Sequence, residues 1–312
     1  METMTSHLLV DRWENAKTEA YVMVGGGPLD WWIGFDQHHR RTLLLVVDQK
    51  PQTIPSSKSV GVTTGHRKDN RWAVTFTLLR DEHNDVFVCL CADLIEVSRN
   101  CVEDAEAVDV VLARYGQWLK LMEHQPSGML SEPRKRGLLG ELWFLQSLLA
   151  SGVAGEEAVA GWVGPDGADQ DFMFPFGWYE VKAVGASGSR VAISSLEQLD
   201  AGPSGTLVVV FVDPSAPDEP NSATLNGRIE DIRKALRPSP TALAAYESKL
   251  LSYGYVALPD YDNDWYRVSG VRRYSVEEDF PRITRSSVAA EVVSAEYSLS
   301  LHALEAWRVN GG

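Results

Sequence analysis

Apolar residues in the first hundred positions fall in short runs of strand length. Thr42–Val47, Trp72–Leu79 and Val86–Leu90 are rich in β-branched and aromatic side chains, and Gly, Pro, Asn and Asp separate them. Each run predicts a strand, and His83–Val86 between two of them has the residue types of a hairpin turn. The opening region is therefore predicted to be mostly β.

A helical pattern and a break end this region. Between Glu103 and Glu123 apolar side chains recur every three or four residues, which predicts an amphipathic helix. The stretch Gln125–Ser131 contains Pro, Ser and Gly and favours a boundary. We predict a β-rich N-terminal domain over residues 1–126 that ends in a helix, and a second domain over residues 127–312.

The second region mixes helical and strand patterns. Ser131 precedes a leucine-rich helical stretch and has the residue type of a helix N-cap, with Pro133 in the first turn. Leu207–Val212 is fully apolar and typical of a buried central strand, and Ser194–Gln198 indicates the start of a short helix. The other predicted elements are strands at 171–174, 178–184, 190–193, 266–276 and 295–299, and helices at 225–236 and 241–253.

Composition and charge restrict the class of protein. The 312 residues are 44% hydrophobic and 23% charged, as in ordinary globular proteins. No apolar run approaches the roughly 20 residues that span a bilayer, and the first residues lack a signal-peptide pattern, so we expect no membrane association. Three cysteines without CxxC spacing favour a reduced, cytoplasmic protein. The net charge of −14 argues against coating nucleic acid by bulk positive charge.

The positions of histidine and cysteine limit the chemistry of the central region. No histidine lies between residues 125 and 301, and all three cysteines precede residue 102. A Cys–His or His-assisted serine mechanism therefore needs a distant element to fold over this region. The chain also lacks a P-loop motif. Chemistry in the central region must use carboxylates and lysine, with or without a metal ion.

Two carboxylates are predicted to face each other in a hairpin. The runs DFMF and YEVKAV flank Pro175-Phe176-Gly177. If Pro175 and Phe176 are the central turn residues, Phe174 faces Gly177 and Asp171 faces Glu180 on the same side of the sheet. A four-residue loop keeps this pairing, whereas a three-residue loop sends one carboxylate to the other side.

Like charges directly opposed in a sheet destabilise it, so a positive group is expected between them. Lys182 shares the face of Glu180 and is one candidate. A divalent cation is the other, because Mg²⁺ typically takes one or two carboxylates, water and substrate phosphate oxygens. Glu180 and Lys182 could equally be a solvated pair on an ordinary strand.

These residues resemble the PD-(D/E)XK nuclease superfamily, with Asp171 as the acidic residue and Glu180-Val181-Lys182 as the E-x-K element. A leucine-rich helix with Glu141 precedes the hairpin, SSLEQL with Gln198 follows it, and an FPRIT run stands at Phe280–Thr284. The arrangement is similar to a poorly characterised bacterial family of PD-(D/E)XK motif proteins linked to restriction–modification and phage defence. The resemblance is strongest over residues 136–212.

The resemblance implies an α+β or α/β architecture, with the β-rich N-terminal domain followed by a restriction-endonuclease-like core of mixed sheet flanked by helices. It implies a Mg²⁺-dependent DNA endonuclease, in which Mn²⁺ substitutes and a metal-activated water hydrolyses the phosphodiester bond to leave a 5′ phosphate. Asp171 and Glu180 would bind the metal, Lys182 would orient the water, and Glu141 and Gln198 would assist. Pro165-Asp166 lies before the hairpin, which leaves Asp166 and Asp169 as alternates to Asp171.

The nuclease resemblance also implies partners. Cutting both strands of DNA usually needs two active sites, so we expect a homodimer or a complex with other defence proteins, such as an ATPase or a methyltransferase. The N-terminal domain would serve recognition or assembly. The candidate DNA contacts, each of which could equally be a solvated surface residue, are Arg134, Lys135, Arg136, Arg190, Arg272 and Arg273.

Two alternatives stay open. The acidic chain fits a nuclease subunit that relies on a partner to hold DNA. A nuclease-fold module that only binds DNA or serves as a scaffold is the other alternative, although a decayed site usually loses one of the three motif residues, Asp171, Glu180 and Lys182.

Overall fold

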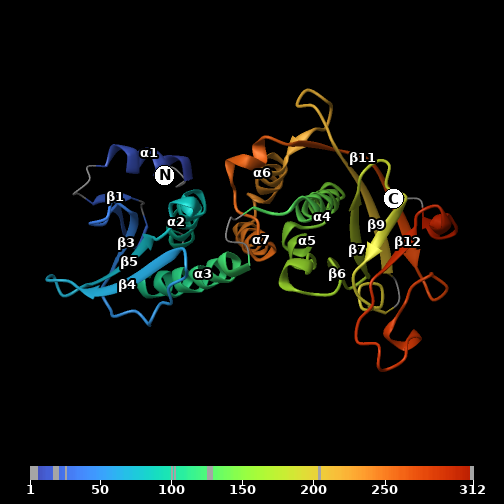
Figure 1. Ribbon diagram of the computed structural model, residues 1–312, viewed down its shortest axis with the longest axis horizontal. Coiled ribbons are helices and arrows are strands. Elements are labelled where there is room, and N and C mark those ends of the chain that lie inside the picture. Colours follow the sequence, from blue (N-terminus) through green and yellow to red (C-terminus); the bar gives the residue numbers. More distant parts are fainter. Residues whose placement is uncertain are drawn as a thin grey trace. The chain divides into compact units, whose positions relative to one another are not determined.

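The protein consists of two compact units, seen here in a computed structural model (Figure 1). The structure describes residues 6–16, 21–24, 27–99, 101, 103–124, 129–202 and 205–309. The N-terminal unit comprises Met1–Met129 with Gly254–Leu258, and the C-terminal unit comprises Leu130–Tyr253 with Pro259–Gly312. Both units combine helices with sheets, which confirms the predicted mixed fold class.

The N-terminal unit contains an antiparallel five-stranded sheet in the order β1-β2-β3-β5-β4. Its elements are α1 (Ser6–Asn15), β1 (Val22–Val24), β2 (Asp30–Phe35), β3 (Arg41–Val47), β4 (Val60–His66), β5 (Trp72–Leu78), η1 (Asp81–His83), α2 (Asn84–Ser98) and α3 (Asp104–His124). Strands β3 and β5 and helix α3 confirm three of the sequence predictions.

The helices of this unit cover one face of its sheet. The Phe76 ring of β5 meets Tyr115 of α3 edge-on, with 5.0 Å between ring centroids. Trp31 of β2 is on the same face and donates its indole N–H to Ser98 Oγ of α2, at 3.1 Å. The alternating apolar residues of the strands thus form a core against α2 and α3.

The predicted strand at Val86–Leu90, with its turn at His83–Val86, is wrong. These residues form η1 and the first turns of α2, in which Val86 to Ala92 are all buried. A helix that is covered on most sides has no polar face, so its sequence is a continuous apolar run. Such a run resembles a buried strand when read from sequence alone.

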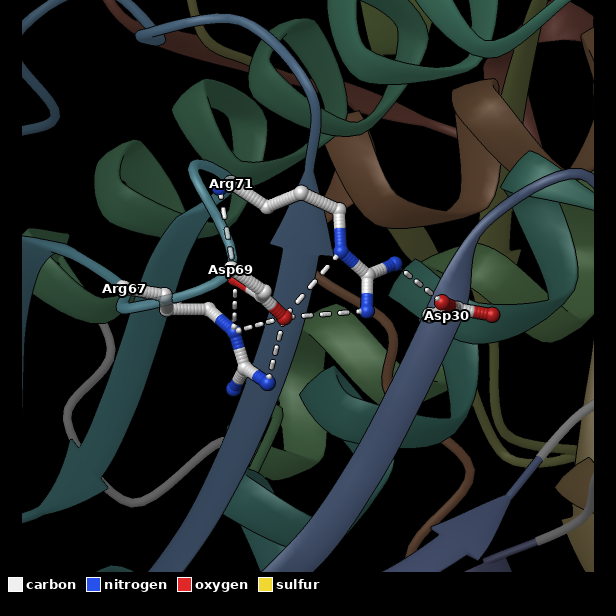
Figure 2. Close-up of polar contacts among 4 residues, drawn as sticks. All are labelled: Asp30, Arg67, Asp69 and Arg71. Carbon is white, nitrogen blue, oxygen red and sulfur yellow. Dashed lines mark hydrogen bonds and ion pairs between the residues drawn. The ribbon is translucent and has the colours of Figure 1, made fainter.

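A cluster of charges closes the hairpin between β4 and β5 (Figure 2). Asn70 takes a left-handed conformation in the turn, with φ of 63°, and Asp69 next to it accepts hydrogen bonds from Arg67 and Arg71. Arg71 also reaches Asp30 of β2 at 2.9 Å. Because Arg67 in particular stabilises the ionised form, the pKa of Asp69 lies well below its usual range. The network ties the hairpin tip to a neighbouring strand.

The C-terminal unit contains a six-stranded mixed sheet in the order β10-β11-β9-β7-β6, with β13 also pairing β11. Its helices are α4 (Glu132–Ala150), α5 (Gly155–Gly161), η2 (Gly164–Asp166), α6 (Leu225–Leu236), α7 (Pro240–Tyr253), η3 (Pro259–Asp262), η4 (Arg285–Ser287) and η5 (Ala303–Trp307). Its strands are β6 (Phe172–Phe174), β7 (Gly177–Val184), β8 (Arg190–Ile193), β9 (Gly205–Pro214), β10 (Ala223–Thr224), β11 (Trp265–Val276), β12 (Tyr297–Ser300) and β13 (Arg308–Val309).

The predicted central strand is confirmed, because β9 lies between β7 and β11 and its residues Leu207 to Val210 are fully buried (Figure 1). It runs parallel to β7 and antiparallel to β11. Helices α6 and α7 also match their predictions. Within the described residues, no helix is long and apolar enough to cross a membrane.

The two faces of β7 have different neighbours. Helix α4 packs closely on one face, where a Cβ added at Gly140 would lie 3.0 Å from the Cβ of Ala183. Trp178 points to the other face and belongs to an apolar core with Val191 and Ile193 of β8. Because side chains alternate along a strand, Glu180 and Lys182 share the face of Trp178.

One local prediction in this unit is wrong, and the predicted N-cap position is confirmed. Residues 194–198 form bends and the beginning of a turn rather than a short helix. Ser131 does stand at the N-cap position of α4, but its side chain makes no capping hydrogen bond. Its position in the chain, rather than its hydroxyl, marks the start of the helix.

Candidate active site

The predicted hairpin register is confirmed. Strands β6 and β7 pair antiparallel with Phe174 opposite Gly177 and Phe172 opposite Tyr179. Asp171 comes directly before the paired residues, at the point where the edge strand begins. The Pro-Phe turn therefore determines which residue of β7 the Asp171 side chain can reach.

The Asp171 side chain forms a hydrogen bond with the backbone of β7 just beyond the end of the β6–β7 pairing. Its Oδ2 accepts the backbone N–H of Val181 at 2.7 Å, a donor that the short strand β6 leaves free. Its own carbonyl accepts the N–H groups of Val163 and Gly164, at 2.9 and 3.0 Å. These bonds hold the carboxylate at the start of β6, beside the middle of β7.

Glu180 and Lys182 are in direct contact on β7. Glu180 is only 1% exposed, and its Oε1 lies 2.7 Å from Lys182 Nζ. The second oxygen, Oε2, is buried and has no hydrogen-bond partner among the described residues. A buried carboxylate oxygen without a donor costs stability, so this atom requires a functional or structural explanation.

Glu141 comes from the middle of α4 and is also buried, at 6% exposure. Its Oε2 accepts the indole N–H of Trp162 at 2.7 Å. Burial is the largest cause that raises the pKa of Glu141 well above its usual value, and the charges of Asp171 and Glu180 add to it. These interactions place Glu141 in the same electrostatic environment as the two hairpin carboxylates.

The pKa values of the other two carboxyl groups, Asp171 and Glu180, are also raised. Burial raises the pKa of Asp171 to about 6, against the lowering effects of the Val181 N–H and of Lys182. Burial and the charge of Asp171 raise the pKa of Glu180 to about 8. The site thus contains two buried acids, Glu141 and Glu180, and the half-buried Asp171. A group of strongly perturbed pKa values is typical of functional sites.

Gln198 contacts the lysine of the site. Its Oε1 accepts from Lys182 Nζ at 3.1 Å and from the Ser194 backbone N–H at 2.8 Å. The structure therefore brings together all five residues that the sequence singled out for catalysis: Glu141, Asp171, Glu180, Lys182 and Gln198. Their roles remain predictions.

The donor set fits a hard divalent cation that also uses other oxygens. Asp171 and Glu180 supply carboxylates, and the partnerless Oε2 of Glu180 is an acceptor that a cation would satisfy. Among the described residues, no three Asp, Glu, His or Cys side chains converge to hold a metal by themselves. Mg²⁺ needs no such cage, because it keeps several waters and binds substrate phosphates.

The alternates to Asp171 lie elsewhere. Asp166 is exposed and forms an ion pair with Lys249, a buried residue of α7 that also donates to the Trp162 carbonyl at 2.6 Å. Asp169 is exposed. Asp166 therefore helps to hold the loop before the hairpin, and the contact with β7 belongs to Asp171.

The predicted DNA contacts of α4 are partly occupied by protein partners. Lys135 is buried and pairs with Asp264 and Glu132, at 2.6 and 2.8 Å, which favours a structural role. Arg134 is exposed and lies over the Tyr253 ring, with 5.3 Å from its guanidinium carbon to the ring centroid. Arg136 reaches Glu132 at 3.5 Å.

The three arginines on strands that were predicted to contact DNA have different surroundings. Arg190 is exposed at the start of β8. Arg272 lies over the Phe211 ring and 3.4 Å from Glu305, whereas Arg273 is half-buried and points to the opposite face of β11. Arg190 is therefore the predicted arginine most open to a phosphate.

Trp162 has a place in the site that the sequence did not reveal. It is fully buried, bonds Glu141 through its indole and pairs with Phe172 through its backbone. A tryptophan in a glycine-rich loop is most simply a core residue, so no local signal identified it. The contact joins α4 to the loop before β6, and its two residues, Glu141 and Trp162, are 21 positions apart.

No curated protein and no solved structure matches the chain. A family model described as "Putative PD-(D/E)XK family member (DUF4420)" matches residues 11–302, which is most of the chain and includes both units. The match agrees with the sequence resemblance and with the Asp171, Glu180 and Lys182 cluster of the mixed sheet. The chain belongs to this PD-(D/E)XK family.

Proposed function

We propose that the protein is a Mg²⁺-dependent DNA endonuclease of the restriction or phage-defence type. The observation that carries this proposal is the partnerless Oε2 of Glu180, a buried carboxylate oxygen with Asp171 and Lys182 beside it. Family membership supports a nuclease-type activity, and DNA is the proposed substrate.

Each residue of the cluster has a proposed task. Asp171 and Glu180 would hold the cation, which when bound stabilises charge on a phosphate and makes water a better nucleophile at neutral pH. Lys182 would orient the attacking water or stabilise the developing negative charge. Glu180 Oε1 and Gln198 Oε1 hold its ammonium from two sides, at 2.7 and 3.1 Å. Glu141, which is buried on α4 and held by the Trp162 indole, would assist them.

The raised pKa values couple cation binding to proton release. With a pKa of about 8, the Glu180 carboxyl keeps its proton at neutral pH until a cation binds. A cation must displace that proton, so its affinity should increase as the pH rises. The proton thus limits the repulsion between two adjacent carboxylates in the free protein.

Partners and location are part of the proposal. The net charge of −14 implies that few local cations, with Arg190 as the most open of the predicted set, hold the DNA backbone. Double-strand cutting would need a homodimer or a complex with an ATPase or methyltransferase, with the N-terminal unit serving recognition or assembly. The free thiols of Cys89, Cys91 and Cys101 favour a cytoplasmic enzyme, and Mn²⁺ should replace Mg²⁺.

Two alternatives use the same fold. In the first, the protein is a nuclease subunit that cuts only with its partner, which its acidic charge favours. In the second, it is an inactive module that binds DNA or serves as a scaffold. The intact cluster of Asp171, Glu180 and Lys182 favours catalysis over the second alternative.

Plasmid cleavage tests the proposal. Supercoiled and linear plasmids, methylated and unmethylated, are incubated with the full chain and Mg²⁺ or Mn²⁺. Wild type is compared with Lys182→Met, which keeps the side-chain length but removes the charge. Lys234→Met is the matched control, because Lys234 is exposed on α6 and only loosely paired, at 3.6 Å from Asp231.

We expect metal-dependent cutting by wild type and by Lys234→Met, and none by Lys182→Met. Discrete products would indicate a sequence-specific enzyme. A folded wild type that binds Mn²⁺ but does not cut would favour the partner-dependent subunit. A wild type that neither cuts nor binds Mn²⁺ would overturn the nuclease and leave the scaffold.

A further inference from the structure

Side chains from two distant parts of the C-terminal unit hold the turn that carries Gln198. The carbonyls of three consecutive residues, Glu197, Gln198 and Leu199, each accept a side-chain hydrogen bond. Gln170 supplies the first two bonds and Arg282 the third. Turn carbonyls at a surface are usually satisfied by water, so three successive protein donors are a specific arrangement.

Gln170 ties this turn to the hairpin. It is buried, at 6% exposure, and stands next to Asp171. Its Nε2 donates to the Glu197 carbonyl at 2.7 Å and to the Gln198 carbonyl at 3.4 Å. One side chain thus connects the segment that presents Asp171 with the turn that presents Gln198.

Arg282 ties the turn to the C-terminal part of the chain. Its Nη1 donates to the Leu199 carbonyl. The arginine is itself fixed, because Phe280 is buried edge-on to Trp307, with 5.8 Å between centroids. The Ile283 N–H also donates to the Tyr297 hydroxyl oxygen at 3.2 Å. The guanidinium therefore reaches the turn from an anchored segment.

Gln198 transmits this anchoring to the lysine. Its Oε1 accepts from both Ser194 N and Lys182 Nζ, so its amide has one orientation. Without its tethers the turn could shift, and the ammonium would keep only its pair with Glu180 Oε1 at 2.7 Å.

We propose that Gln170 and Arg282 are positioning residues that fix the Lys182 ammonium through Gln198. The inference rests on the proposed nuclease function and adds two residues to its machinery. Neither side chain needs to touch substrate. A displacement of about 1 Å in a catalytic group can reduce turnover by about 100-fold, so loss of a tether should lower kcat by about 10- to 100-fold. KM for DNA should change little.

The variants separate positioning from folding. Arg282→Met and Gln170→Met remove the donors and keep most of the side-chain volume. Arg282→Lys keeps the charge and a donor. Arg285→Met is the matched control, because Arg285 also donates to backbone carbonyls, those of Val292 and Val293, three positions further along the chain.

Two readouts are measured on the full chain. The first is the rate of plasmid cleavage in Mg²⁺, divided into kcat and KM. The second is hydrogen exchange of the Ser194 backbone amide by NMR, which reports the bond to Gln198 Oε1 without any need for activity. Loss of that bond should speed exchange by about 5-fold. A double variant with Gln198→Met tests whether the tethers act through Gln198.

We expect Arg282→Met and Gln170→Met to lower kcat and speed exchange at Ser194, Arg282→Lys to recover part of both, and Arg285→Met to match wild type. In the Gln198→Met background, Arg282→Met should cause no further loss of kcat. Unchanged exchange and kcat in the tether variants would overturn the inference, and so would additive losses in the double variant. If wild type does not cut DNA, the proposed function fails, and exchange at Ser194 alone decides whether the tethers fix Gln198.

Discussion

Replacing Glu180 by glutamine should change how the stability of the protein depends on pH. The carboxyl is 1% exposed, and burial together with the charge of Asp171 raises its pKa from an ordinary 4.5 to about 8. Between these two values the folded protein holds a proton that the unfolded chain has released. The free energy of unfolding must therefore fall as the pH rises from 5 to 8.

The size of this fall follows from proton linkage. One proton bound only by the folded state changes the free energy of unfolding by about 1.4 kcal/mol per pH unit. From pH 5 to pH 8, Glu180 should therefore contribute about 3 to 4 kcal/mol of lost stability. Glutamine at this position has no proton to lose, so the variant should lack this share of the slope.

The assay is urea unfolding at several pH values between 5 and 8, in EDTA and in excess Mn²⁺. Wild type is compared with Glu180→Gln and with Glu296→Gln, an exposed carboxylate of the same unit that serves as the control. Asp171 and Glu141 titrate in all three proteins, and the charge of Glu180 raises the pKa of Glu141. The difference in slope between wild type and Glu180→Gln therefore reports Glu180 together with its coupling to these neighbours. In Mn²⁺ the wild-type slope should flatten, because the cation replaces the proton.

Parallel curves for wild type and Glu180→Gln in EDTA would refute the reasoning, because they would mean that the buried carboxyl is ionised throughout this range. Identical wild-type curves with and without Mn²⁺ would instead show that no cation binds at the hairpin carboxylates, and the proposed metal site would be lost.

Three other substitutions test separate parts of the structure. Trp162→Phe removes the donor to the buried Glu141 and should lower the free energy of unfolding by about 1 to 3 kcal/mol in urea titrations. Gly161→Ala places a Cβ 2.1 Å from the Phe174 ring and should cost about 1 to 3 kcal/mol by the same measurement, unless the ring moves freely. Asp69→Asn in the exposed hairpin tip should lower the free energy of unfolding less than either of these two substitutions. The loss should shrink in high salt, because salt screens exposed charges.

The hairpin of the site was predictable because its turn determines its register. Once Pro175 and Phe176 occupy the turn, each side chain of β6 has a defined neighbour on β7, and Asp171 must approach Glu180. Glu180 and Lys182 are two positions apart on one strand, so the alternation of side chains alone places them on the same face. Local geometry was sufficient to bring these three residues together.

Contacts between distant segments were not predictable. The basic stretch at the start of α4 suggested a phosphate contact, but Lys135 pairs with Asp264, which is 129 positions away. Trp162 and Gln170 serve the site through partners on other elements. At Val86–Leu90 the chain forms a buried helix, because tertiary burial on most sides removes the periodicity that separates helix from strand.

The five-residue segment Gly254–Leu258 has a consequence for synthesis. It belongs to the N-terminal unit, where Tyr255, Val256 and Leu258 are buried and Ala257 accepts a weak hydrogen bond from the Cys89 thiol. A ribosome that has finished residue 129 must add 124 more residues before this segment follows. At about 5–20 residues per second, that delay is roughly 6 to 25 s. During this interval the nascent N-terminal unit lacks part of its own core, and a gene fragment that ends at residue 129 encodes an incomplete unit.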